Sequence, residues 1–215
     1  MSVLWIRQVR VKANVPFFST GLCYPLEWRR RSWSMIRSTV LAAILVVSAT
    51  AGLGDSAMTP KMKPATKLTW SYVADTVMGG VSKGQSDLGS ENGRDFIRLT
   101  GEVSTENRGG FIQVRTMIES LGQEDQGLVL KVRGNGERYF IHLRTRATRF
   151  PWQYYQAVFE TEPVWREVSL PWSAFKPSGK LLPKRVSPET VRSIGLVAFG
   201  RDHSADVSLA EIGVY

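Results

Sequence analysis

The stretch Asp75-Thr-Val-Met-Gly-Gly-Val-Ser-Lys-Gly84 follows closely after the aromatic residues Trp70 and Tyr72. Two apolar residues lead into its glycine pair, and more Gly and Ser come behind it. A Gly-Gly pair in this setting predicts backbone that enters positive φ or lies very close to a neighbouring segment. We therefore expect a constrained loop rather than a linker. A second glycine pair stands downstream in Asn107-Arg-Gly-Gly-Phe111.

Working outward from this loop, the chain from residue 68 onward shows a period of two. Residues 128–133 and 139–144 have a core-type residue at every second position, which is typical of half-buried strands: Leu128, Leu130 and Val132 in the first run, and Tyr139, Ile141 and Leu143 in the second. The turn Gly134-Asn135-Gly136 joins them, and Asn-Gly between alternating runs predicts a β-hairpin. Further strands are expected at residues 95–103, 111–117, 154–160, 165–170, 193–199 and 207–215. Short strands at this spacing predict an all-β fold, an antiparallel β-sandwich or jelly roll.

These motifs resemble the signature of the complex I intermediate-associated protein 30 family. The order continues with Gly134-Asn-Gly136 before Tyr139, Phe159 before Trp165, Leu170-Pro-Trp172 before Phe175, and Ile194-Gly-Leu196. The resemblance covers about residues 66–215 and implies a galactose-binding-like β-sandwich. It also implies a non-catalytic assembly factor, because members of that family act on the respiratory NADH:ubiquinone oxidoreductase in mitochondria.

We interpret the family motif loop as structural, with a possible secondary role at a partner-binding edge. Its residues are Asp75, Val77, Met78, Gly79, Gly80, Val81, Ser82, Gly84, Asn107, Gly109, Gly110 and Phe111.

Composition narrows the classes of function. The chain of 215 residues has a formal net charge of +9, but seven of its 28 basic side chains and only two of its 19 acidic ones precede residue 58. Over half of the excess charge therefore lies in the leader, and the rest is a mixed-charge surface that argues against nucleic-acid binding.

The leader has the pattern of a secretory signal. Residues 35–57 combine a charged start, a short apolar run and small residues near a cleavage point, so we expect export to the periplasm or the extracellular space. A mitochondrial transit peptide is the alternative. Residues 1–34 are expected to lie upstream of the true start or to be disordered, residues 58–67 to be a linker, and residues 68–215 to form one domain. No stable membrane anchor is expected after cleavage, and the single Cys23 precedes the signal.

Two catalytic alternatives are weaker than the structural interpretation. Residues 80–84 match the G-x-S-x-G nucleophile elbow around Ser82, with Asp202 and His203 as further triad members, but no strand-turn-helix context surrounds them. A calcium site at Asp75, Asp202 and Asp206 is less favoured than turn-capping aspartates. We expect no metal, no cofactor and no catalytic residue.

Two surfaces remain as candidate binding sites. Arg144, Arg146 and Arg149 leave the far end of a strand and could meet an acidic partner, while Trp152 and Tyr154 could stack on a sugar. The sequence thus predicts an accessory or assembly factor that binds a protein partner, with a carbohydrate- or small-ligand-binding module as the alternative.

Overall fold

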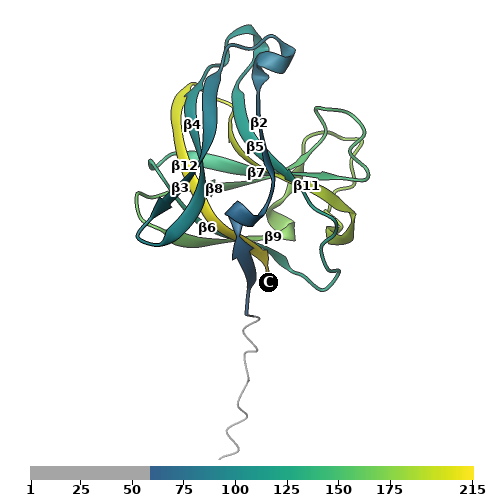
Figure 1. Cartoon of the computed structure of the whole chain (residues 1–215). Helices are drawn as coiled ribbons and strands as arrows, with labels where there is room; N and C mark the ends of the chain where they lie inside the picture. The colour runs from purple at the N-terminus through teal and green to yellow at the C-terminus, as the bar shows by residue number, and fades with distance from the viewer. Residues whose placement is uncertain (1–58) are drawn as a thin grey trace, which may run out of the picture. The chain divides into compact units, whose positions relative to one another are not determined.

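The computed structural model describes residues 59–215 as two antiparallel β-sheets packed face to face (Figure 1). Its regular structure consists of strands and short 3₁₀ turns. The prediction of an all-β antiparallel sandwich is confirmed. The segments 1–34 and 35–57, for which we predicted an untranslated or disordered start and a signal peptide, lie outside the described residues.

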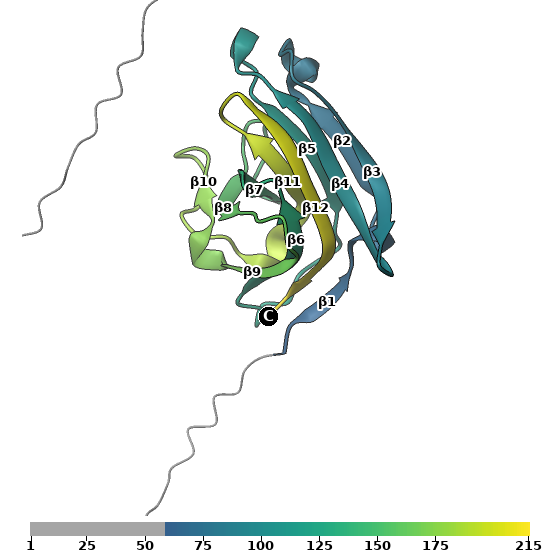
Figure 2. The same cartoon turned by 90° about the vertical axis from the view of Figure 1, so that its left-hand side faces the viewer.

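The first sheet, sheet A, has the strand order β3-β4-β12-β6-β9, and β1 also pairs with β12 (Figure 2). Its strands are β1 (Lys61–Pro64), β3 (Lys83–Glu91), β4 (Arg94–Val103), β6 (Gly127–Gly134), β9 (Arg166–Pro171) and β12 (His203–Val214). The long strand β12 pairs with β4 along its first part and with β6 along its second part.

The second sheet, sheet B, has the order β10-β8-β7-β11-β5-β2. Its strands are β2 (Trp70–Ala74), β5 (Phe111–Met117), β7 (Arg138–Thr145), β8 (Tyr155–Glu160), β10 (Lys176–Pro177) and β11 (Val191–Phe199). The 3₁₀ turns are η1 (Ala65–Lys67), η2 (Asp75–Met78), η3 (Glu106–Arg108), η4 (Trp172–Ala174) and η5 (Pro188–Thr190).

The core lies between the sheets and follows the alternation seen in the sequence. Every second residue of β6 and β7 is buried on the inner face, as Leu130 and Ile141 illustrate. Burial of one side chain of this size contributes about 1.5–3 kcal/mol, so the two inner faces supply the hydrophobic stabilisation of the sandwich. The charged, polar and aromatic residues at the alternate positions of the strands therefore point to the outer faces.

The predicted hairpin at Gly134-Asn135-Gly136 is wrong, because β6 belongs to sheet A and β7 to sheet B. The turn instead crosses between the sheets. Asn135 holds this corner: its side-chain amide donates to Ser204 O at 2.9 Å, and its Oδ1 accepts from the Tyr139 hydroxyl at 2.7 Å. Gly136 has φ 86°, as the Asn-Gly signal predicted, but Asn135 does not have positive φ, and the type of connection differs from the prediction.

Structure also begins earlier than the expected linker at residues 58–67 suggests. Lys61–Pro64 forms β1 against the C-terminal end of β12, and Ala65 is fully buried. The start of β1 and the C-terminus therefore lie close together (Figure 2). Within residues 59–215, no helix is long and apolar enough to cross a membrane.

Candidate binding site

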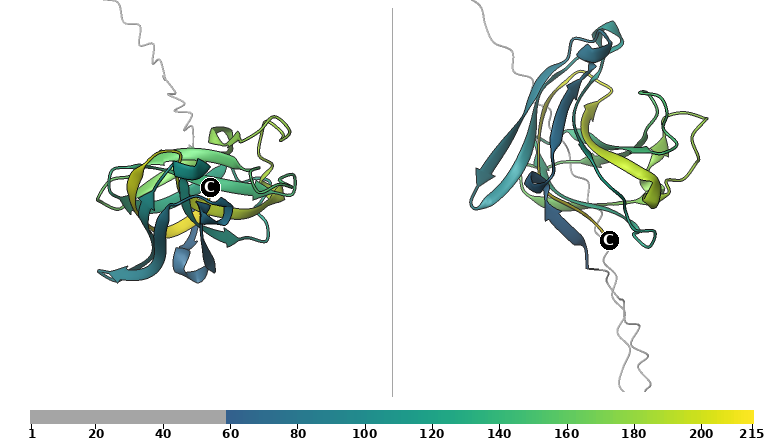
Figure 3. Two further views of the ribbon diagram at one scale, coloured as in Figure 1. Left: turned by 90° about the horizontal axis from the view of Figure 1, so that it is seen from above. Right: turned by 45° about the vertical axis from the view of Figure 1, so that its right-hand side comes forward.

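A cleft of about 430 Å³ lies on the outer face of sheet B. Its lining comes from β2, β5, β7 and β11, from turns η2 and η3, and from the loop that follows β7. In the right-hand view of Figure 3, the blue turns and the green loops stand on either side of β11. This volume is within the range of small-ligand sites, which are usually 300–1,000 Å³.

The floor of the cleft is low because β11 presents small residues outward. Ser193 and Gly195 alternate with the core residues Ile194 and Leu196. Gly195 pairs with Arg115 on β5 and with His142 on β7, so the strand between those two large side chains carries none of its own at this level. The glycine therefore produces the depression.

Aromatic rings form one wall. The His142 and Tyr154 rings stack with centroids 4.1 Å apart and planes 12° apart, and the Phe199 ring meets His142 edge-on at 5.6 Å. Burial lowers the pKa of His142 to about 4, against an opposing effect of Gln156, and burial also raises the pKa of Tyr154. At neutral pH this wall is therefore uncharged.

The mouth of the cleft carries an ordered aromatic pair. Phe150 and Trp152 stack with centroids 5.0 Å apart, and Trp152 is 66% exposed. The loop that holds them is pinned at both ends: Gln153 Oε1 accepts from Phe150 N at 3.1 Å, and Ser178 Oγ donates to Trp152 O at 2.9 Å. An exposed ring on a fixed loop offers an apolar face without a large entropic cost of ordering.

Arginines supply the charge of the cleft. Arg115 and Arg144 lie on β5 and β7, on either side of β11, and Arg108 lies at the rim. Arg144 Nη2 donates to Phe150 O at 3.0 Å, and the pKa of Arg144 is lowered by burial and by repulsion from Arg115. No Asp or Glu is among the described residues that line the cleft.

The family motif loop is organised by the buried carboxylate of Asp75. Its Oδ2 accepts from Ser82 Oγ at 2.5 Å and from Gly110 N at 2.6 Å, while its Oδ1 accepts from Ser82 N at 3.0 Å. Phe111 N donates to the same carboxylate at 3.2 Å. Burial alone would raise the pKa of Asp75, but these hydrogen bonds together lower it. One carboxylate thus joins the two glycine-rich stretches of the motif.

The glycines of the motif are required by this carboxylate. A Cβ on Gly80 would lie 2.3 Å from Asp75 Cγ, and one on Gly109 would lie 2.4 Å from Asp75 Oδ2. Gly79 meets nothing within 4 Å but has φ 90°, where glycine is favoured. The loop is therefore constrained for both of the reasons that the glycine pair predicted.

The hydrogen bonds of the Asp75 carboxylate position the upper rim of the cleft. Turns η2 and η3 lie side by side at the top of the molecule (Figures 1 and 2). Val77 and Met78 of η2 are 74% and 62% exposed, and both line the cleft together with Gly109 and Phe111. The motif is thus structural in its buried part and a rim of the cleft in its exposed part.

The three members of the formal triad lie in separate hydrogen-bond networks. Ser82 is buried on Asp75 and precedes a strand, whereas Asp202 Oδ1 accepts from Thr105 N at 2.7 Å. The His203 ring lies 2.8 Å from Arg201 O.

The aspartates proposed as calcium ligands are also separated. Asp206 forms an ion pair with Arg98 at 2.6 Å, while Asp75 and Asp202 accept the hydrogen bonds described above. Among residues 59–215, no group of three or more His, Cys, Asp or Glu is arranged to hold a metal ion.

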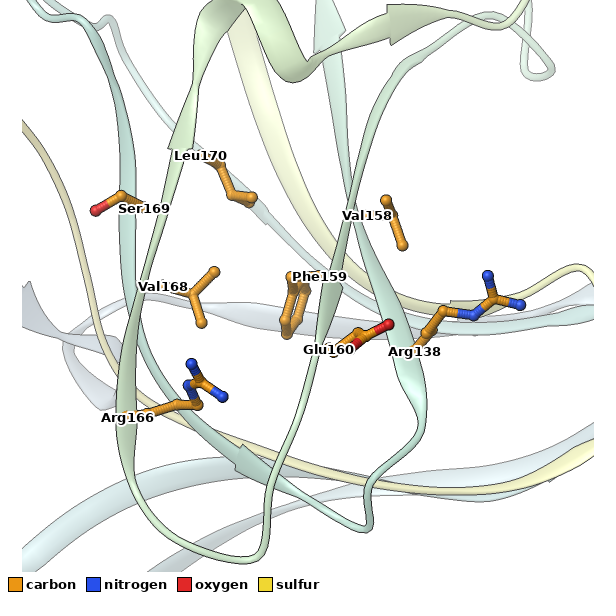
Figure 4. Close-up of a pocket in the computed structure, with 8 residues that line it drawn as sticks. All are labelled: Arg138, Val158, Phe159, Glu160, Arg166, Val168, Ser169 and Leu170. Atoms are coloured by element: carbon orange, nitrogen blue, oxygen red, sulfur yellow. The ribbon is translucent and has the colours of Figure 1, made fainter. Parts of the chain in front are cut away.

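A second recess, of about 460 Å³, opens where the edge of sheet A faces β8. Figure 4 shows Val168 and Leu170 pointing from β9 toward Phe159 on β8. Phe159 and Leu170 belong to the buried core, so the recess offers no exposed ring face. It is a gap at the edge of the sandwich rather than a shaped site.

The structure brings together part of the predicted surface. Arg144, Trp152 and Tyr154 line the cleft, whereas Arg146 and Arg149 do not. Sequence reasoning missed Arg115, His142, Gly195 and Phe199. Outward positions on neighbouring strands would have indicated them, but their alignment depends on strand pairing over long sequence distances.

The sequence matches one known protein family over most of its length. The sequence profile described as complex I intermediate-associated protein 30 matches residues 61–210. The chain belongs to the complex I intermediate-associated protein 30 family. No match is found among curated protein sequences.

Two solved structures that share the fold of this chain are carbohydrate-binding modules. The family 11 module of the cellulosomal cellulase Lic26A-Cel5E of Clostridium thermocellum superposes with a TM-score of 0.59 at 13% identity, covering 74% of this chain and 95% of that chain. A family 11 module from Clostridium thermocellum, in complex with a beta-1,3-1,4-mixed-linked tetrasaccharide, has a TM-score of 0.58 at 12% identity and covers 72% and 94%. These likenesses establish the galactose-binding-like sandwich that the resemblance implied.

Proposed function

We propose that this chain is a non-catalytic accessory protein that binds a saccharide in the cleft on the outer face of sheet B. The observation that carries the proposal is the combination of a low Gly195 floor with the exposed, pinned Trp152 ring at the mouth. Sugar rings present C–H faces that pack on aromatic rings and hydroxyls that bond to polar side chains. The cleft offers both aromatic rings and polar side chains.

The comparisons favour this choice of ligand class. A family 11 module of the same fold forms a complex with a beta-1,3-1,4-mixed-linked tetrasaccharide, and the family match supports an accessory rather than a catalytic role. The pinned Trp152 loop also suits a ligand that needs a preformed site.

A protein partner is the second candidate, and the exposed rim favours it. Val77 and Met78 are mostly exposed apolar side chains beside the cleft, as is typical of the centre of a protein interface. The assembly role suggested by the family name fits this candidate. Val77→Asp with Met78→Asp would weaken such an association, which a pull-down with the unmodified protein as the reference would measure.

Export remains part of the proposal. The signal-like residues 35–57 would place the domain outside the cytoplasm, where polysaccharides are available as ligands. N-terminal sequencing of the native protein tests this, since a first residue upstream of Met35 would contradict it.

A glycan array followed by calorimetric titration tests the binding function. We expect at least one oligosaccharide to bind and Trp152→Ala to weaken its binding on the order of tenfold or more, because truncating an aromatic anchor of a binding site costs about 2 kcal/mol or more. Leu88→Ala removes an exposed apolar side chain from sheet A and serves as the control. The proposal fails if no saccharide binds, or if Trp152→Ala and Leu88→Ala behave alike.

A further inference from the structure

The two outer faces of the sandwich differ in whether their basic side chains form ion pairs. On sheet A, arginines and lysines pair with acids across strands: Arg98 with Asp206, Lys131 with Glu167 and Arg133 with Glu91. The remaining ion pairs of residues 59–215 join Arg166 to Glu162 and Arg201 to Glu137. None of them includes an arginine of the cleft.

Arg115 and Arg144 are therefore two positive groups held near each other without a carboxylate between them. They flank the strand whose small residues Ser193 and Gly195 leave the space open. Arg144 uses one donor on Phe150 O, and a guanidinium carries five. Burial and repulsion from Arg115 both disfavour the charged form of Arg144, and a bound anion would offset both effects.

The other polar groups of the cleft do not replace such an anion. His142 is a neutral ring at physiological pH, and Gln113 carries no charge. A neutral ligand would leave both guanidiniums without a counter-charge. A ligand that carries its own negative groups at the arginines and a ring face at Trp152 satisfies the whole lining.

We propose that the saccharide bound in the cleft is acidic, with carboxylate or sulfate groups placed against Arg115 and Arg144 and one sugar ring packed on Trp152. This inference rests on the proposed function and adds the class of ligand. A carboxylate and a sulfate each present a pair of anionic oxygens that can accept two hydrogen bonds from one guanidinium. An acidic peptide is the competing occupant.

Calorimetric titration of the full chain with four probes tests this inference. The probes are a tetramer of galacturonic acid, a sulfated tetrasaccharide derived from heparin, the neutral beta-1,3-1,4-mixed-linked glucan tetrasaccharide, and a peptide of alternating Asp and Glu. We expect one of the two acidic saccharides to bind on the order of tenfold tighter than the neutral one, and its affinity to fall with added salt. The acidic saccharide that binds more tightly shows whether the preferred anionic group is a carboxylate or a sulfate.

Variants separate the two arginines from general charge. Arg115→Gln with Arg144→Gln should remove the preference for the acidic saccharide, while Arg146→Gln with Arg149→Gln, outside the cleft lining, should leave it unchanged. Arg144→Lys keeps the charge and should lose part of the affinity, because the planar fork is missing. Thermal melting identifies any variant that is unfolded. If the double variant is unfolded, Arg115→Gln alone tests the inference, because Arg115 makes no ion pair within the described chain.

The outcomes are distinguishable. Neutral saccharide bound as tightly as the acidic ones, with binding abolished by Trp152→Ala, overturns the acidic class and leaves the saccharide function standing. Binding of the acidic peptide alone, or of no probe, overturns both.

Discussion

At the residue scale, one buried carboxylate explains most of the family motif. Asp75 accepts hydrogen bonds from Ser82, Gly110 and Phe111, and its position excludes any side chain at Gly80. The two glycine-rich stretches lie about 30 residues apart in the sequence, so nothing local links them. Once linked, they place the exposed part of η2 at the rim of the cleft.

The two neighbouring glycines should differ in cost when replaced by alanine. Gly80→Ala is expected to lower the free energy of unfolding by about 2–4 kcal/mol, because its Cβ meets a carboxylate that four donors hold in place. Gly79→Ala should cost only about 1 kcal/mol, from positive φ alone. Chemical denaturation of both variants checks this. Equal losses would contradict the role of Asp75.

The buried imidazole of His142 should make stability depend on pH. In the unfolded chain it titrates near 6.5, and in the folded protein its pKa is about 4. Between these values the unfolded state binds more protons, so stability rises with pH: the contribution is complete above about 6.5 and is lost as the pH falls toward 4. The loss is at most about 3 kcal/mol.

The comparison for this prediction is His142→Phe, which keeps a ring against Tyr154 but takes up no proton. We expect its free energy of unfolding to change less than that of the unmodified protein between about pH 7 and about pH 4.5. Asp75 does not interfere, because its pKa is lowered and its contribution is lost only at more acidic pH. Parallel declines in both proteins would show that His142 is not the group that titrates.

At the element scale, β11 creates the cleft by what it lacks. Its outward positions Ser193 and Gly195 are small, while the strands on either side carry Arg115 and Arg144. The motif Ile194-Gly195-Leu196 could be noted in the sequence, but its role depends on partners in β5 and β7. Local periodicity predicted the strands and the inward faces, yet not which strands meet.

Filling the floor of the cleft should block binding without unfolding the protein. In Gly195→Leu, the new Cβ lies 3.1 Å from Gln113 Oε1, the flexible end of a side chain that can move aside. We expect affinity for the bound saccharide to fall on the order of tenfold or more, while the melting temperature changes little. Gly179→Leu, in open space outside the cleft, is the matched control. Unchanged binding in Gly195→Leu would place the site elsewhere.

The turn at Gly134-Asn135-Gly136 illustrates where sequence reasoning stopped. The need for positive φ at Gly136 was readable, because it is a local property. Assignment of the two flanking strands to different sheets was not, because it depends on Asn135 meeting Ser204 and Tyr139 at the corner.

At the scale of the whole molecule, the two outer faces of the sandwich differ in charge pairing and in shape. Sheet A satisfies its own charges with cross-strand ion pairs, and sheet B leaves arginines and aromatic rings around an open cleft. The fold class and the family were predictable from alternation and motifs. The cleft was only partly predictable, because Trp152, Tyr154 and Arg144 were singled out while the floor and Arg115 depended on the pairing of distant strands.

The most direct test of this account is an NMR titration of the ¹⁵N-labelled protein with the saccharide that binds best. We predict chemical-shift changes at the Trp152 indole N–H and at the backbone amides of Gly195, Arg115 and Arg144, with sheet A unchanged. Shifts centred on the recess between β8 and β9, or on the outer face of sheet A, would contradict the claim that the outer face of sheet B is the binding site.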